Sequence, residues 1–191
     1  MSHHENLKIL AFVGLTGSGK SSAVKHFTEK GYPKVYFGGV IYDAMAEAGI
    51  EKGEDNEKVF RVEIRKKEGE DFVVKRIIQQ IHDLAAAGQH RIIADGIYTW
   101  AEYKAIKHEF PGETFVIALT SPKHLRYQRL ENREDRPQTA AISASRDTRE
   151  IEDLQKGGPI AAADYYVANN ENAEHFYKQL DAIAEHIGFN S

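Results

Sequence analysis

The sequence predicts an α/β protein, a three-layer sandwich built around a five-stranded parallel sheet. Three observations favour this fold. Short apolar, β-rich runs alternate with longer helical stretches along the 191 residues. Several of these runs are almost continuously apolar, as strands covered on both faces are. The first run leads directly into a glycine-rich loop and then a helix. Strands separated by helices indicate βαβ units, and therefore a parallel sheet.

The strands are expected, in chain order, at Leu7–Val13, Lys34–Phe37, Arg91–Ala94, Phe115–Leu119 and Tyr165–Ala168. The expected helices are Lys20–Lys30, Val40–Ala48, Asn56–Lys67, Asp71–Ala87, Trp100–Phe110, Pro122–Arg133, Ala140–Lys156 and Asn172–Ile187. Five glycines fall where helices should end, namely Gly31, Gly49, Gly69, Gly88 and Gly112. Pro122 suits a first helical turn, with Ser121 before it as the predicted N-cap.

Composition narrows the class of protein. A chain of this length fits one domain, and a net charge of -4 gives no general attraction to nucleic acid or to an anionic membrane. The absence of cysteine excludes disulfides, thiolate metal sites and thiol catalysis. The polar segment Met1–Lys8 is unlike a signal peptide, and no run approaches the roughly 20 apolar residues of a membrane span. We therefore expect a cytoplasmic protein without membrane or nucleic-acid partners.

The strongest motif is the loop after the first strand, which reads Gly14-x-x-x-x-Gly19-Lys20-Ser21. Its glycines let successive backbone N–H groups point inward and cradle phosphate oxygens, and the following helix adds positive potential. Lys20 should reach the β- and γ-phosphates of ATP, while the Ser21 hydroxyl ligates Mg²⁺. The alternative is a Gly/Ser-rich turn that only connects strand and helix, and the complete consensus disfavours it. The predicted nucleotide contacts are Gly14, Thr16, Gly17, Ser18, Gly19, Lys20, Ser21 and Ser22.

A second acidic element is Asp95-Gly96, at the end of an apolar strand. Ligands of open α/β sheets collect at the carboxyl ends of the strands, so Asp95 could hold a Mg-bound water or accept a proton from the attacking group. The alternative is a turn that merely ends the strand. Switch-type GTPases are disfavoured because the chain lacks both a D-x-x-G turn and an N/T-K-x-D motif.

A cluster of arginines follows the fourth strand. Arg129 and Arg133 are four residues apart and share one helix face, where like charges repel unless an anion joins them. Phosphoryl transfer supplies such an anion. Glu131 and Glu134 lie among them, so a solvated helix of mixed charge is the alternative. Both interpretations also stay open for Arg126, Arg146 and Arg149.

The phosphate loop, Asp95-Gly96, Arg129-x-x-x-Arg133 and the closing run 163–169 (ADYYVAN) resemble the nucleoside-monophosphate-kinase-like P-loop family. The resemblance covers nearly the whole chain and is closest to archaeal-type kinases described as dephospho-CoA-kinase-like or adenylate-kinase-like. It implies a single kinase domain over residues 1–191, with a helical lid at about 122–157 and an acceptor-binding helical region at about 38–88. It also implies that Arg129 stacks on adenine and that Arg133 contacts the ATP phosphates.

The chain departs from this family where the acceptor should bind. Adenylate kinases usually carry G-D-x-[LI]-R after the second strand, and this chain has Gly38-Gly39-Val40-Ile41-Tyr42. After Asp95-Gly96, where an arginine is usual, it has Ile97-Tyr98-Thr99. Tyr42 and Tyr98 thus stand near positions of acceptor-binding arginines. Their rings could stack on an acceptor or simply pack in the core.

Three further residues are candidates for the acceptor site. Arg61 and Arg65 share one face of a predicted helix and could bind the acceptor, or could belong to an exposed face paired with acids. Asp43 could be a general base toward an acceptor hydroxyl, or a residue that starts a helix.

The sequence therefore favours an ATP-dependent phosphotransferase acting on a small molecule, such as a nucleotide, a nucleoside or a dephospho-CoA-like acceptor. Lys20, Asp95 and Arg133 are its predicted catalytic residues. An ATP-binding regulatory module with slow hydrolysis and no acceptor is the alternative. A nucleic-acid-processing ATPase is disfavoured by the negative net charge.

Overall fold

The computed structural model describes residues 6–51, 53–69, 71–134 and 136–190. Within helix α3 the side chains of residues 54, 55, 57, 58, 61 and 65 are outside this description. Five parallel strands form one sheet in the order β2-β3-β1-β4-β5. Their bounds are β1 Lys8–Val13, β2 Lys34–Tyr36, β3 Arg91–Asp95, β4 Thr114–Thr120 and β5 Tyr165–Ala168. The predicted five-stranded parallel sheet is confirmed.

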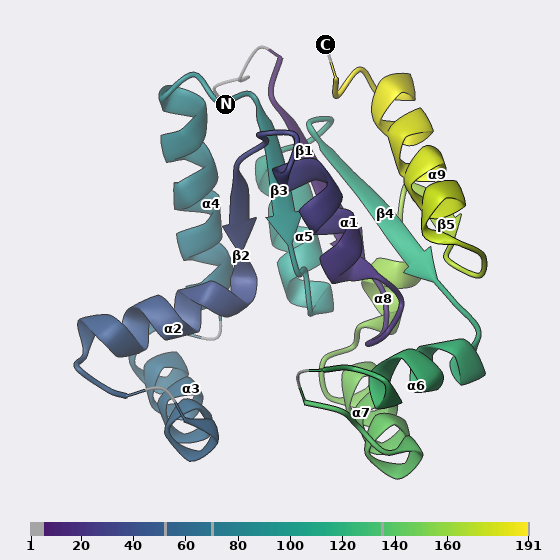
Figure 1. Ribbon diagram of the computed structural model, residues 1–191. Coiled ribbons are helices and arrows are strands. Elements are labelled where there is room, and N and C mark those ends of the chain that lie inside the picture. Colours follow the sequence, from purple (N-terminus) through teal and green to yellow (C-terminus); the bar gives the residue numbers. More distant parts are fainter. Residues whose placement is uncertain (1–5, 52, 70, 135, 191) are drawn as a thin grey trace.

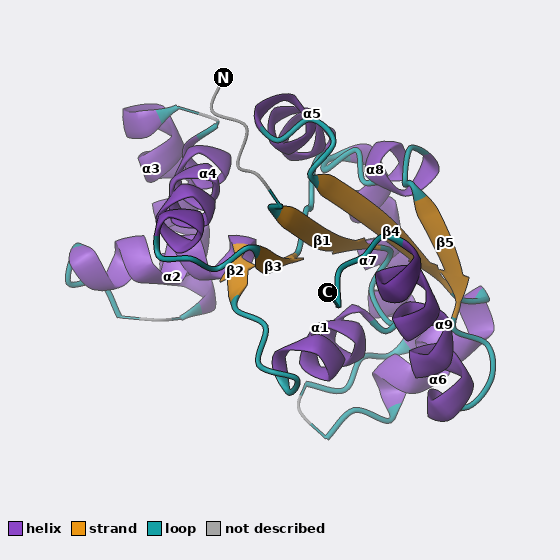
Figure 2. Cartoon of the chain, turned by 90° about the horizontal axis from the view of Figure 1, so that it is seen from above, coloured by secondary structure: helices purple, strands orange, loops and turns teal. Residues whose placement is uncertain are grey.

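Helices cover both faces of the sheet. Helices α1 (Lys20–Thr28) and α9 (Ala173–His186) lie on one face, and α4 (Phe72–Ala86), α5 (Trp100–Glu109) and α8 (Gly157–Ala161) on the other (Figure 2). Strand β1 shows why three layers form, because its alternate side chains enter different cores. Ile9, Ala11 and Val13 belong to one hydrophobic cluster, and Leu10 and Phe12 to the other.

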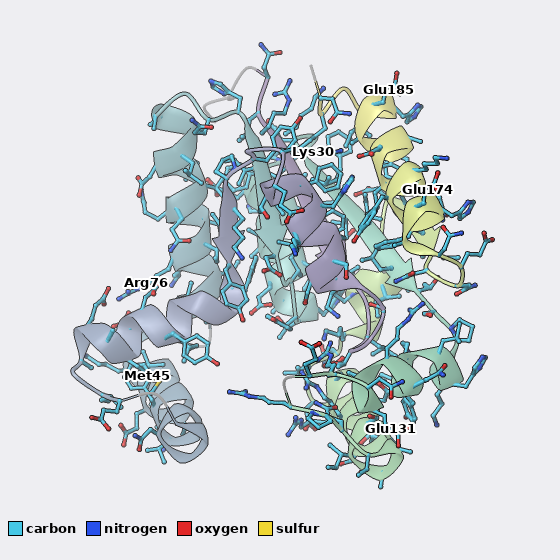
Figure 3. The ribbon with its side chains drawn as sticks, in the orientation of Figure 1. Lys30, Met45, Arg76, Glu131, Glu174 and Glu185 are labelled. Atoms are coloured by element: carbon cyan, nitrogen blue, oxygen red, sulfur yellow. The ribbon has the colours of Figure 1, made fainter. Side chains whose placement is uncertain are left out.

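Two helix pairs project beyond the carboxyl ends of the strands, one on each side of the sheet (Figure 1). One pair is α2 (Phe37–Glu47) with α3 (Glu54–Glu68), and the other is α6 (Lys123–Glu131) with α7 (Ala140–Glu152). Met45 is fully buried and points from α2 toward α3, and Arg76 ties α4 to α2 through an ion pair with Glu47 (Figure 3). The carboxyl edge of the sheet therefore has a helical arm on either side.

Most predicted helix boundaries lie within two residues of those in the structure, but two are wrong by three residues or more. Helix α2 begins at Phe37, not Val40, and contains Gly38 and Gly39. A Cβ at Gly38 would lie 2.6 Å from the Tyr36 hydroxyl oxygen, so glycine lets the helix start directly after β2. The helix predicted over Ala140–Lys156 ends at Glu152, because Gln155 adopts a left-handed conformation (φ 51°) and a separate helix α8 follows.

Helix ends supply one further correction and one confirmation. Ser121 is not an N-cap, because α6 begins one residue later than expected, with Pro122 in the N-cap position. The Ser121 hydroxyl instead donates to the carbonyl oxygen of Asn169 at 2.9 Å. The five glycines predicted at helix ends all have positive φ, as expected.

Within the part of the chain that the structure describes, no helix is both long and apolar enough to cross a bilayer.

Candidate active site

The phosphate loop lies between the end of β1 and the start of α1, at the carboxyl edge of the sheet. β1 is the central strand, with β3 on one side and β4 on the other. The crossover from β1 runs to β2 on one side, whereas the crossover from β3 passes β1 and runs to β4 on the other side. The direction of the crossovers therefore reverses beside β1, where open α/β sheets bind their ligands. The fold therefore presents the loop at the position most suited to a bound molecule.

Two loop glycines cannot carry a side chain. Gly14 has φ 149° and Gly17 has φ 84°, values that L side chains rarely adopt. A Cβ at Gly14 would lie 2.5 Å from the carbonyl oxygen of Leu119, and one at Gly17 would lie 2.8 Å from that of Arg126. The glycines thus allow the loop to curl tightly between β4 and α6.

Lys20, the first residue of α1, turns back over the loop. Its ammonium donates to the carbonyl oxygens of Gly14 at 2.6 Å and Leu15 at 3.1 Å. Desolvation by burial is the main reason that the pKa of Lys20 is lowered to about 7, and repulsion from Lys156 is the next largest cause. An anion placed beside Lys20 would raise this pKa again, so the group is suited to binding one.

A cavity of about 360 Å³ opens beside the loop. It is lined by loop residues, by Tyr98 and by charged side chains from the α6–α8 segment: Thr16, Gly17, Gly19, Lys20, Ser21, Ser22, Tyr98, Arg129, Arg133, Arg146, Glu150 and Lys156. Five of these side chains are cationic and one is a carboxylate. The cavity therefore suits a polyanion such as a nucleoside triphosphate.

Arg129 fixes the ends of two strands against the loop. Its guanidinium donates to the Ser121 hydroxyl at 3.1 Å and to the Asn169 carbonyl oxygen at 2.8 Å. The Asn169 side-chain amide in turn donates to the carbonyl oxygen of Ser18 at 3.0 Å. Arg129 thus borders the cavity while joining the segments after β4 and β5.

Arg126 has a structural partner. It is buried, and its guanidinium forms a bidentate pair with Asp147 at 2.8 and 2.6 Å. It also donates to the carbonyl oxygen of Thr16 at 2.9 Å. Arg126 therefore links α6, α7 and the phosphate loop. Arg149 is exposed and is not among the described residues that line the cavity, whereas Arg146 is.

Two functional candidates were missed in the sequence, Glu150 and Lys156. The Glu150 carboxylate accepts hydrogen bonds from the Thr16 N–H at 3.2 Å and the Thr16 hydroxyl at 2.5 Å. It pairs with the Lys156 ammonium at 2.9 Å and the Arg146 guanidinium at 3.3 Å. Burial opposes its ionisation, but Lys156, the Thr16 hydroxyl and Lys20 lower the pKa of Glu150 to about 2. Glu150 is therefore a fixed anion beside the loop.

Tyr98 lines the cavity, and the Lys156 ammonium lies 5.0 Å from the centre of its ring. Desolvation, with a smaller contribution from Tyr36, raises the pKa of the Tyr98 phenol. Tyr98 therefore presents a neutral hydroxyl and a ring to the site.

Asp95 ends β3, beside β1, and its carboxylate lies 3.7 Å from the Lys34 ammonium. Burial raises the pKa of Asp95, although Lys34 acts in the opposite direction. The raised pKa makes the carboxylate a stronger base than an exposed aspartate. Asp95 is not among the described residues lining the cavity, but its charge interacts with that of Lys20.

The other predicted residues lie in several places. Ser21 and Ser22 are exposed at the start of α1 and line the cavity, while Ser18 is buried with its hydroxyl lacking a hydrogen-bond partner within the described structure. Tyr42 and Asp43 lie on α2, half-buried and exposed respectively, outside the described cavity lining. Arg61 and Arg65 lie on α3, and their side chains fall outside the described part of the chain.

Comparison with known proteins identifies the family. A family model described as an AAA domain matches residues 10–155. A UPF0200 protein of Thermococcus onnurineus is 30% identical over 182 residues, which cover 94% of this chain and 97% of the relative. The chain belongs to the AAA domain family and to the UPF0200 proteins.

Solved structures agree on the fold. A shikimate kinase of Bacteroides thetaiotaomicron has a TM-score of 0.57 at 12% identity, over 95% of this chain and 98% of that one. A dephospho-CoA kinase of Campylobacter jejuni has a TM-score of 0.57 at 13% identity, with the same coverage of both chains. At these identities the likeness shows the fold alone, and that fold is the P-loop kinase fold implied by the sequence resemblance.

Arg126→Ala should strongly destabilise the protein, because it leaves the largely buried Asp147 carboxylate without its guanidinium. We expect a loss of about 3–5 kcal/mol in the free energy of unfolding, measured by urea denaturation. Arg149→Ala, on the same pair of helices but exposed, is the matched control and should change stability by no more than about 0.5 kcal/mol. Equal stability of the two variants would contradict the structural role of Arg126.

Proposed function

We propose that the protein is an ATP-dependent phosphotransferase, a kinase that moves the γ-phosphoryl group of ATP to a small-molecule acceptor. The observation that carries this proposal is the cavity itself, in which a complete phosphate loop, with its Lys20, opens onto four further cationic side chains. Catalysis of phosphoryl transfer consists mainly of positioning and neutralising charge, and this cavity offers both. The resemblance of the sequence to nucleoside-monophosphate-kinase-like proteins supports the same activity.

The phosphate loop is the proposed nucleotide site. Its backbone N–H groups and Lys20 would hold the β- and γ-phosphates. The Ser21 hydroxyl is exposed at the cavity, and a hydroxyl oxygen is a ligand that Mg²⁺ accepts, so Ser21 fits a Mg²⁺–triphosphate. When bound, Mg²⁺ neutralises charge on the phosphate oxygens.

Residues 122–157 form the proposed lid. Arg129 and Arg133 border the cavity from this segment, and Arg133 is exposed. Movement of Arg133 onto the transferring phosphoryl group would stabilise charge that builds in the transition state and would exclude water from it.

The acceptor would bind between the sheet edge and the helical region over residues 38–88. Asp95 is the proposed general base, because its raised pKa suits removal of a proton from an acceptor hydroxyl. Tyr98, Tyr42, Asp43, Arg61 and Arg65 are the proposed acceptor contacts. Candidate acceptors are a nucleotide, a nucleoside or a dephospho-CoA-like molecule, and the solved kinases of similar fold extend the panel to shikimate.

A transfer assay tests this function. Labelled Mg-ATP is incubated with the protein and a panel of these acceptors, and we expect slow hydrolysis alone, strong stimulation by one acceptor and label on that acceptor. Asp95→Asn keeps the shape but removes the base, and should lower transfer by a factor of about 10² or more. Asp83→Asn on α4, at an exposed side chain that accepts a hydrogen bond from Gln79, is the control and should leave transfer unchanged. An exhaustive panel without stimulation would overturn the kinase and favour an ATP-binding regulatory module.

Binding of Mg-ATP should take up protons. Anionic phosphates beside Lys20 would raise its pKa above the value of about 7 given by desolvation and Lys156. Below pH 7 Lys20 carries its proton in both the free protein and the ATP complex. Above pH 7 Lys20 of the free protein has lost this proton, and binding of ATP must take it up again from solution. Affinity should therefore fall as the pH rises, by up to about tenfold per pH unit.

Calorimetry at about pH 8, where the ATP phosphates are fully ionised, measures this uptake directly. Titrations in two buffers with different heats of ionisation should give different binding heats. The difference between them should correspond to the uptake of nearly one proton for each ATP bound. Heats that do not depend on the buffer would contradict the role of Lys20.

A further inference from the structure

Buried charge is concentrated at one place in this protein. Among the described side chains, the charged ones that are buried are Arg126, Glu150 and Lys156, with 5%, 4% and 1% of their surfaces exposed. All three contact the phosphate loop or one another. A buried charge is costly unless it is paired, so this concentration calls for an explanation in terms of the site.

The partners of Glu150 are of the kinds that bind phosphate. They are a backbone N–H of the phosphate loop, a hydroxyl, an ammonium and a guanidinium, from Thr16, Lys156 and Arg146. Charge-assisted donors of this kind hold carboxylate and phosphate oxygens equally well. The carboxylate thus occupies a set of donors that a phosphate group could use.

Glu150 also shares its cavity with Lys20, the residue expected to contact a terminal phosphate. It lines the same cavity as Lys20, and its charge acts on that lysine. The lysine of a phosphate loop, here Lys20, is expected to reach the β- and γ-phosphates. A terminal phosphate and the Glu150 carboxylate would therefore be close and would repel each other.

Resting on the proposed kinase function, we propose that Glu150 competes with the terminal phosphate of ATP for the Thr16 amide and for Lys156. Binding of ATP transfers the Lys156 ammonium from Glu150 to that phosphate. Lys156 is then a phosphate-binding residue of the site, and Glu150 is its internal counter-ion.

The chain between the two residues permits this exchange. Glu150 lies in the last turn of α7, and Lys156 immediately precedes α8. Gln155, with φ 51°, separates the two helices, so Glu150 and Lys156 belong to different segments. The ion pair can open without unwinding either helix, and the strongly anionic phosphate keeps the buried ammonium paired.

Calorimetric titration of Glu150→Gln with Mg-ATP and Mg-ADP tests the proposal. Gln keeps the size of the side chain and removes its charge, so ATP should bind about tenfold more tightly or better, while ADP, without the terminal phosphate, changes by less than about threefold. Lys156→Met should weaken ATP more than ADP. Glu152→Gln, an exposed residue on the same helix, is the charge-matched control and should leave both affinities unchanged.

The outcomes separate this inference from the proposed function. If the wild-type protein binds neither nucleotide, the proposed function fails. If the wild type binds ATP but Glu150→Gln binds it equally or more weakly, the competition is refuted and Glu150 is a permanent brace for Thr16.

A crystal structure of the wild type with a non-hydrolysable ATP analogue decides the matter if Glu150→Gln does not fold. The Lys156 ammonium within hydrogen-bonding distance of the terminal phosphate, with Glu150 detached from Thr16, supports the exchange. An intact Glu150–Thr16–Lys156 set beside bound phosphates overturns it.

Discussion

The need to pair buried charges beside the phosphate loop is the constraint on which the rest of this site depends. The segments that surround the loop provide its support from outside. Arg126 holds the Thr16 carbonyl oxygen, and Glu150 holds the Thr16 N–H and hydroxyl. Because each charge would be costly to leave unpaired, α6, α7 and the loop are held as one electrostatic unit.

The sheet explains how distant parts of the chain reach this unit. The parallel strands end at one edge, so the segments after β1, β3, β4 and β5 all arrive there. Ser121 and Asn169, which follow β4 and β5, meet at Arg129, and Asp95 ends β3. The two helical arms flank this edge (Figure 1), so that nucleotide and acceptor would approach it from different sides.

The sequence predicted those features that follow from local rules. Apolar runs defined the strands, and the loop consensus located Lys20 and Ser21 beside what proved to be a cavity. Glu150 and Lys156 were not predicted because their role depends on the contact between Glu150 and Thr16, which are 134 residues apart in the sequence. On sequence alone they are ordinary charges in a charged helical segment. Arg126 shows the same limit, since its partner Asp147 identifies its role only in the folded chain.

Hydrogen exchange tests most directly whether the phosphate loop and the α6–α7 segment act as one unit. Exchange of backbone amides in residues 14–20 and 140–152 is followed by mass spectrometry while Mg-ATP is titrated. The account predicts that both segments change their exchange rates with the same midpoint, because Thr16 connects them. Protection of the loop with no change in residues 140–152 would contradict it.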